Sequence, residues 1–235
     1  MIVRDLLFHM RNRWIVLIVT IFSLELSAAP TRFEMRDAGG RNSVVFISEG
    51  ILEKTVGLSN AVSGWLEVDS ERVMEGFKGE FEVDVRTFYT GIEQRNEFIR
   101  EKLLGASEFP LATFSCQRIV SFSKNALFDG IPISLRVDGV LKMRGVQRGQ
   151  TVTMQLTYLR QSEVTKQRLP GNLLKVSTSF DIDTQPYGFQ IPEIFRLRFS
   201  RFVQVFVEIL GTDQPIGLPV GSAAGASGPH APIKK

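Results

Sequence analysis

The stretch GEFEVDVRTFYTGIEQRNEFIREKLLG (residues 79–105) carries two side-chain patterns, one after the other. At first, apolar Phe81, Val83 and Val85 alternate with charged residues, which is the pattern of a strand with one buried face. After Thr90 the apolar residues recur at helical spacing instead. The stretch therefore predicts a half-buried strand followed by one short amphipathic helix.

Alternation of the first kind recurs along most of the chain. It is strong in residues 133–141, 151–160 and 175–182, and weaker in residues 43–48, 62–68, 111–116 and 201–210. Together with residues 79–88, these segments predict about eight strands. Because each strand has one polar face, an antiparallel sandwich or barrel is expected rather than a parallel α/β sheet. No repeat or linker divides this region, so it is taken as one domain.

Two capping signals bound the predicted helix. Thr90 and Glu93 have the spacing of a capping box, in which each side chain accepts a hydrogen bond from the other residue's backbone N–H. Gly105 is placed to end the helix in a left-handed conformation. The apolar face of the helix comprises Ile92, Phe98, Ile99 and Leu103. A lone amphipathic helix in such a barrel is expected to lie across an opening and close it with this face.

Residues 1–29 read as a signal peptide. Basic residues precede the apolar run 14–24, which is too short to span a bilayer, and small residues before and at Ala29 suit a signal peptidase. Translation from Met1 or from Met10 sends the protein out of the cytoplasm in either case. An uncleaved membrane anchor is the alternative interpretation of the same segment.

The other end of the chain has a different composition. Gly, Pro, Ala and Ser supply 15 of the 25 residues in 211–235. Such a segment cannot bury enough apolar surface to offset the entropy that ordering it would cost. The predicted organisation is a signal peptide (1–29), a barrel domain (30–210) and a disordered tail (211–235).

The charge and the cysteine content limit which partners and which location are expected for the protein. Without residues 1–29 the chain keeps 25 basic and 23 acidic residues, so nothing favours nucleic acid. Cys116, the only cysteine, cannot form an internal disulfide, and no cysteine lies near the cleavage site for lipid attachment. A periplasmic or secreted protein without a permanent membrane anchor is expected, and a homodimer is left open.

The sequence offers little for catalysis. The two histidines, His9 and His230, lie in the leader and the tail, and no nucleophile, phosphate-binding or metal motif is present. Carboxylates such as Glu80, Glu82 and Asp84 alternate with the apolar face and are expected to be solvated. Hence no catalytic residue, no metal ligand and no cofactor is predicted; an enzyme that uses only carboxylates remains a distant alternative.

Three segments, in this order, resemble the YceI-like family of exported lipid-binding proteins. They are RTFYTGIEQRNEFIREKLLGASEFPLATF (86–114), GVLKMRGV (139–146) and DIDTQPYGFQIP (181–192), and the likeness spans most of residues 32–210. The resemblance implies an elongated antiparallel β-barrel, lipocalin-like in outline, with one short helix closing it and an isoprenoid or related lipid inside. Two departures stand out: Asn96 replaces an Asp that the family often has, and Thr184 replaces an Arg.

These observations predict a lipid carrier, store or sensor whose barrel encloses a polyisoprenoid, isoprenoid quinone or fatty acyl chain. Arg95 is expected to contact a polar head group or to pair with a nearby acid. The alternative is an envelope interaction module whose barrel is filled by the same side chains. The predicted cavity residues are Phe81, Val83, Val85, Phe98, Ile99, Leu103, Leu135, Val137, Met154, Leu156, Phe180 and Ile182.

Overall fold

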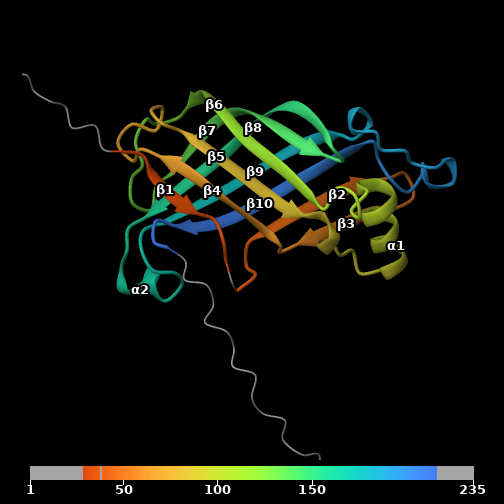
Figure 1. The fold of residues 1–235 in the computed structure, drawn as a ribbon, viewed down its shortest axis with the longest axis horizontal. Coiled ribbons are helices and arrows are strands. Elements are labelled where there is room, and N and C mark those ends of the chain that lie inside the picture. Colours follow the sequence, from red (N-terminus) through yellow and green to blue (C-terminus); the bar gives the residue numbers. More distant parts are fainter. Residues whose placement is uncertain (1–28, 38, 216–235) are drawn as a thin grey trace, which may run out of the picture.

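Ten antiparallel strands form one sheet in the part of the chain that the computed structural model describes, residues 29–37 and 39–215. Eight of them, in the order β1-β4-β5-β6-β7-β8-β9-β10, form a ring that the pairing of β1 with β10 closes (Figure 1). The predicted antiparallel barrel is confirmed. The strands are β1 (Thr31–Glu34), β2 (Ser43–Glu49), β3 (Lys54–Ser59), β4 (Val62–Val68), β5 (Lys78–Asp84), β6 (Leu111–Phe122), β7 (Pro132–Met143), β8 (Val146–Leu159), β9 (Leu173–Asp183) and β10 (Phe202–Thr212).

The hairpin β2–β3 lies outside this ring order and makes the two ends of the barrel unequal. The last residue of β10, Thr212, pairs with Glu34 of β1. The earlier part of the same edge of β10, from Val203 to Glu208, pairs with β2, and β2 pairs in turn with β3. At one end, therefore, β1 alone stands between β10 and β4, whereas at the other end two strands take that place.

All eight predicted strands are present, and two further strands were missed. β1 has only four residues. β3 has an inverted pattern, because Thr55, Gly57 and Ser59 face inward and are buried while Val56 and Leu58 are exposed. Gly57 is needed there, since a Cβ would lie 2.1 Å from the Phe46 ring. This strand was missed because its glycine and polar residues face inward and its apolar residues face solvent, the reverse of the usual pattern of a half-buried strand.

The predicted helix is confirmed, but its start is not the predicted capping box. Helix α1 (Glu93–Glu97) continues into the π-helical turn η2 (Phe98–Leu104), which ends at Gly105 with φ 63° as expected. Ile92 is the N-cap residue, and no side chain makes a capping hydrogen bond at this helix start. Instead the backbone N–H and hydroxyl of Thr90 donate to Asn96 Oδ1 at 2.7 and 2.8 Å. The fully buried Asn96 also donates to Glu93 Oε2 at 3.0 Å, so Glu93 is engaged with Asn96.

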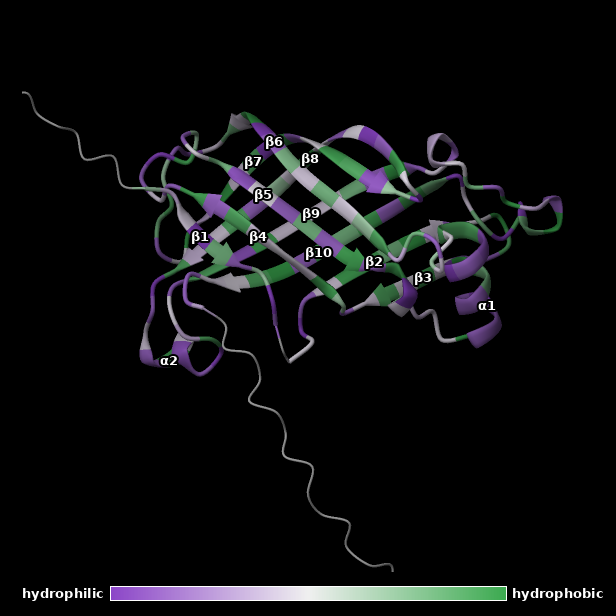
Figure 2. Cartoon of the chain, in the orientation of Figure 1, coloured by the Kyte–Doolittle hydropathy of each residue, from purple (hydrophilic) through white to green (hydrophobic). Residues whose placement is uncertain are grey.

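The end of the barrel opposite α1 is packed. Inward side chains such as Leu66 of β4, Leu135 of β7, and Met154 and Leu156 of β8 are almost wholly buried there. Figure 2 shows the underlying pattern, in which apolar and polar residues alternate along the crossing strands. This filled part is called the packed half below.

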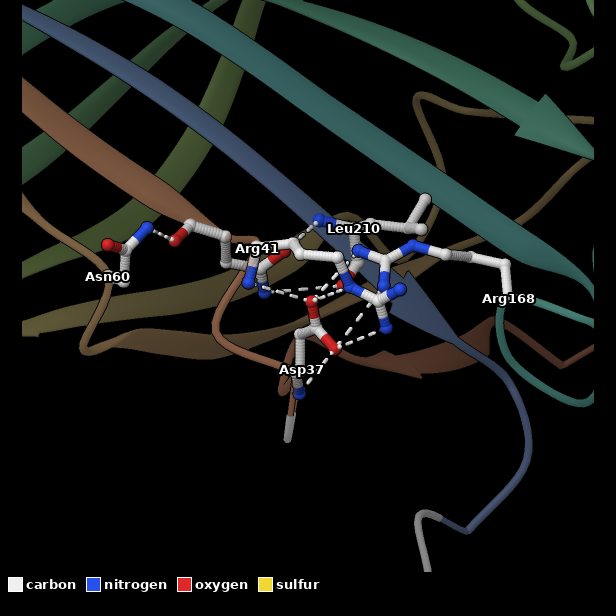
Figure 3. A network of polar contacts seen from close by, with 7 residues as sticks. Asp37, Arg41, Asn60, Arg168 and Leu210 are labelled. Atoms are coloured by element: carbon white, nitrogen blue, oxygen red, sulfur yellow. Dashed lines mark hydrogen bonds and ion pairs between the residues drawn. The ribbon is translucent and has the colours of Figure 1, made fainter.

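The buried Asp37 carboxylate fastens the connection between β1 and β2 to the packed end of the barrel (Figure 3). The Asp37 side chain is 1% exposed and accepts hydrogen bonds from Arg41 Nε at 3.1 Å and Arg168 Nη2 at 2.8 Å. Arg168 follows the short helix α2 (Glu163–Lys166). Nearby, Asn42 Oδ1 accepts from the Leu210 N–H at 2.9 Å. The connection is thus tied both to the segment that follows α2 and to β10.

The predicted domain boundaries are placed only in part. The signal peptide falls on residues 1–28 and Ala29, and the first 28 lie outside the described residues, as do 216–235 of the tail. β10 runs to Thr212, and Asp213 accepts from the backbone and side chain of Asn172 at 2.9 and 2.6 Å, so the barrel extends past residue 210. In residues 29–37 and 39–215, no helix is long and apolar enough to cross a membrane.

Candidate functional site: an apolar cavity

The end of the barrel beneath α1 and η2 is hollow. A cavity there holds about 1090 Å³ of space that no protein atom fills, counting its opening to solvent. Its walls come from the inward faces of β2, β4, β5, β6, β7, β9 and β10, and η2 covers it. This part is called the hollow half below.

Seven of the predicted residues lie around this cavity. The end of β5 and the residue after it supply three, η2 supplies two, and the last part of β9 supplies two. They are Phe81, Val83, Val85, Ile99, Leu103, Phe180 and Ile182. The strand alternation and the helical face therefore bring together residues that are up to about a hundred positions apart in the chain.

Four of the predicted residues do not reach the cavity. Leu135 and Val137 on β7 and Met154 and Leu156 on β8 point inward but lie in the packed half, where each is 0–1% exposed. The period of a strand reports which face a residue lies on. It carries no information on depth along the barrel, which is why these residues were grouped with the others.

Phe98 contacts the cavity only through a neighbour. Its ring packs against Phe195 at 4.7 Å and Phe199 at 5.8 Å between centroids. Of these three rings, Phe199 lines the cavity. The three phenylalanines thus join α1 and η2 to the long connection between β9 and β10.

Arg95 also lies away from the cavity lining. Its Nε and Nη2 donate to the hydroxyl and carbonyl oxygens of Thr90 at 2.9 and 2.8 Å, and Nη1 lies 3.8 Å from Glu53 Oε2. The side chain thereby links the start of α1 to the loop between β2 and β3. Of the two predicted roles, the observed contacts are those of pairing with a neighbouring acid.

Several lining residues were missed by sequence reasoning. Inward residues such as Phe46 on β2 and Val205 on β10 belong to segments whose alternation could have found them. Phe189, Ile191 and Phe199 come from the β9–β10 connection, where no periodic pattern exists to assign a face.

The lining is almost entirely apolar. Among the described lining residues, Glu82 is the one that bears a charge, and its carboxylate accepts a hydrogen bond from Ser63 Oγ, which is not part of the lining, at 3.0 Å. The hydroxyl-bearing lining residues are Ser48, Thr113, Thr184 and Ser200. Ser48 Oγ accepts from the Ser200 N–H at 2.9 Å, and the Thr184 hydroxyl donates to the Arg201 carbonyl at 2.8 Å. No Arg or Lys is among the described residues that line the cavity.

No histidine or cysteine is among the described residues that line the cavity. No group of three His, Cys, Asp or Glu side chains in the described ranges is placed to hold a metal ion. Cys116 packs against the core, and its burial raises the pKa of the thiol to about 12. It is therefore a thiol and not a reactive thiolate at neutral pH.

Comparisons with known proteins identify relatives of this fold. The family model of the YceI-like domain matches residues 38–219. No curated protein matches the chain. Among solved structures, BcnA of Burkholderia cenocepacia is similar, with a TM-score of 0.56, 18% identity, and coverage of 73% of this chain and 97% of its own.

Two further structures have the same fold at low identity. A polyisoprenoid-binding domain from Saccharophagus degradans, implicated in plant cell wall breakdown, gives a TM-score of 0.58 at 16% identity, covering 77% of this chain and 97% of its own. A YceI protein of Campylobacter jejuni gives 0.50 at 14%, covering 63% and 79%. At such identities the structures show a shared fold. Because the family model matches well over half of the sequence, this chain belongs to the YceI-like family.

Proposed function

We propose that the protein is an exported binding protein that encloses one lipid chain in its hollow half. The observation that carries the proposal is the cavity beneath η2, whose walls are almost entirely apolar, as in most sites for small ligands. Removing apolar surface from water stabilises a complex by roughly 25 cal/mol per Å², so a long hydrocarbon chain needs no other attraction. The polyisoprenoid-binding domain of the same fold supports an isoprenoid chain as the first candidate.

The charge of the lining favours a neutral ligand. A phosphate or carboxylate inside the cavity would meet no cationic side chain among the described lining residues. Burying an unpaired charge costs several kcal/mol or more, whereas a hydroxyl or carbonyl group can bond to hydroxyls such as those of Ser48 and Ser200. An isoprenoid alcohol, a quinone or another neutral lipid is therefore the proposed class of ligand.

Binding without catalysis is the proposed role. The alternative, an interaction module with a filled barrel, is disfavoured because only one half of the barrel is filled. The predicted leader supports an exported location, in which such a protein would carry, store or sense the lipid.

Native mass spectrometry of the protein purified from its host's envelope tests the proposal. We expect a second species heavier than the polypeptide by the mass of one lipid. Added geranylgeraniol should produce a one-to-one complex and raise the melting temperature, and geranylgeranyl phosphate should bind at least about tenfold more weakly. A bare polypeptide mass together with an unchanged melting temperature would reject lipid binding. Equal binding of the phosphate would reject only the neutral class.

A further inference from the structure

Two loops at the hollow end expose large aliphatic side chains. In the β2–β3 loop, Ile51 is 83% and Leu52 68% exposed. In the β9–β10 connection, Ile194 is 77% and Leu197 48% exposed. Both loops lie at the end of the barrel that carries α1, and α2 lies at the opposite end (Figure 1). These four residues are called the apolar tips.

The two loops are held together as one unit. The Leu52 N–H donates to the Leu197 carbonyl at 2.8 Å. Gly50 allows this approach, because a Cβ on it would lie within 2.4 Å of the backbone of Arg198. The 3-10 turn η4 (Glu193–Phe195) is anchored as well, since the Phe195 ring packs against the Phe98 ring in a tilted arrangement. The two loops that carry the apolar tips are therefore held to each other and to η2 by these contacts.

The same connection leads into the cavity. Ile191, Phe199 and Ser200 line it, and Phe199 follows the exposed Leu197 by two residues. The connection therefore carries apolar side chains both on the outside of the barrel end and inside the cavity.

Charged residues of both signs flank the tips, and Glu53 directly follows Leu52. Arg198 lies over the Phe195 ring at 5.9 Å, and Arg196 pairs with Glu193 at 2.8 Å. Long basic side chains beside aliphatic ones suit the head-group layer, where the stem can lie on apolar surface while the guanidinium meets phosphate.

We propose that the apolar tips insert into the surface of a phospholipid bilayer and bring the cavity mouth against it. Exposed aliphatic residues on loops fit a fluid lipid layer, whereas the core of a protein interface is enriched in aromatic residues packed to high complementarity. The proposal rests on the proposed function only for the lipid that would enter the cavity from the bilayer. The docking itself does not require a ligand.

Vesicle co-sedimentation tests the docking. The vesicles consist of phosphatidylethanolamine and phosphatidylglycerol, and the variant is L52D/I194D. The matched control is Val164→Asp on α2, whose side chain is also 77% exposed but lies at the other end. We expect the double variant to partition at least about tenfold more weakly and the control to bind like wild type.

Three results would overturn the docking proposal: no binding of the wild type, equal binding of the double variant, or an equal loss in the control. A dimer in solution that L52D/I194D dissociates would also overturn it, in favour of a second copy as the occupant. Native mass spectrometry of the same proteins with geranylgeraniol separates the two proposals. Ligand binding without vesicle binding rejects only the docking, and vesicle binding without ligand binding rejects only the proposed function. Equal melting temperatures of the three proteins check that all are folded.

Discussion

The packed half and the hollow half are built by the same strands, yet only one of them is filled. β7 runs through both, and its inward residues Leu135 and Leu141 are of one type and on one face. Leu135 is enclosed by other side chains, whereas Leu141 borders the cavity. Alternation within a strand therefore decides that a barrel forms but not whether its interior is occupied.

The difference follows from the circumference of the barrel. At the packed end β1 joins β4 to β10 directly, whereas at the hollow end the hairpin β2–β3 stands in that place. The interior of a barrel widens with the number of strands around it. Side chains that meet across the narrower end then leave space at the wider end, which α1 and η2 cover.

The largest expected contrast comes from truncating one leucine in each half. Leu135→Ala should lower the free energy of unfolding by about 3–4 kcal/mol, because it opens a new cavity among packed side chains. Leu141→Ala should cost about 1–2 kcal/mol, because its side chain already borders empty space. Urea unfolding of the ligand-free proteins measures both. Equal losses would contradict the division into two halves.

Enlarging a valine in each half sharpens the comparison with a smaller effect. Val137→Phe should destabilise the protein by about 1–3 kcal/mol through overpacking, since Val137 is fully enclosed. Val83→Phe should change stability by less than about 1 kcal/mol, because the new ring can extend into the cavity. It should also abolish geranylgeraniol binding, measured by native mass spectrometry. Unimpaired binding to V83F would place the ligand elsewhere.

The smallest effect is expected at Cys116, near the boundary between the halves on β6. Its thiol has a pKa of about 12 in the folded protein against an ordinary value of 9.0. Between these pH values the unfolded chain loses the proton while the folded chain keeps it, so stability should fall as pH rises from about 9 to 12. Cys116→Ala should remove this part of the pH dependence and change stability at pH 7 by less than about 1 kcal/mol. Parallel curves for both proteins in alkaline urea titrations would show that the thiol is not buried.

Sequence patterns predicted the faces of strands well and their depth not at all. The segments with apolar residues at every second position all became strands, and inward residues such as Phe81 and Phe180 were assigned to the interior. Leu156 belongs to a strand with the same alternation, but it lies in the packed half. Its position along the barrel depends on pairing between strands that are distant in the sequence. β3 escaped prediction because Gly57 and its polar neighbours face inward.

Tertiary contacts also decided details at the hollow end. Thr90 and Glu93 have capping-box spacing, but the buried Asn96 amide takes both as partners. The β9–β10 connection supplies Phe199 to the cavity without any periodic signal. Such features depend on which segments meet in space, and the local sequence does not record that.

The central claim is that the hollow half is a ligand site and the packed half is not. A crystal structure of the protein grown with a bromine-labelled isoprenoid alcohol tests it most directly, because anomalous scattering locates the bromine without interpretation. We predict a single peak among Phe180, Leu141 and Phe199, with the side chains of the packed half unmoved. A bromine peak only on the outer surface, or hollow-half side chains collapsed into the space, would contradict the account.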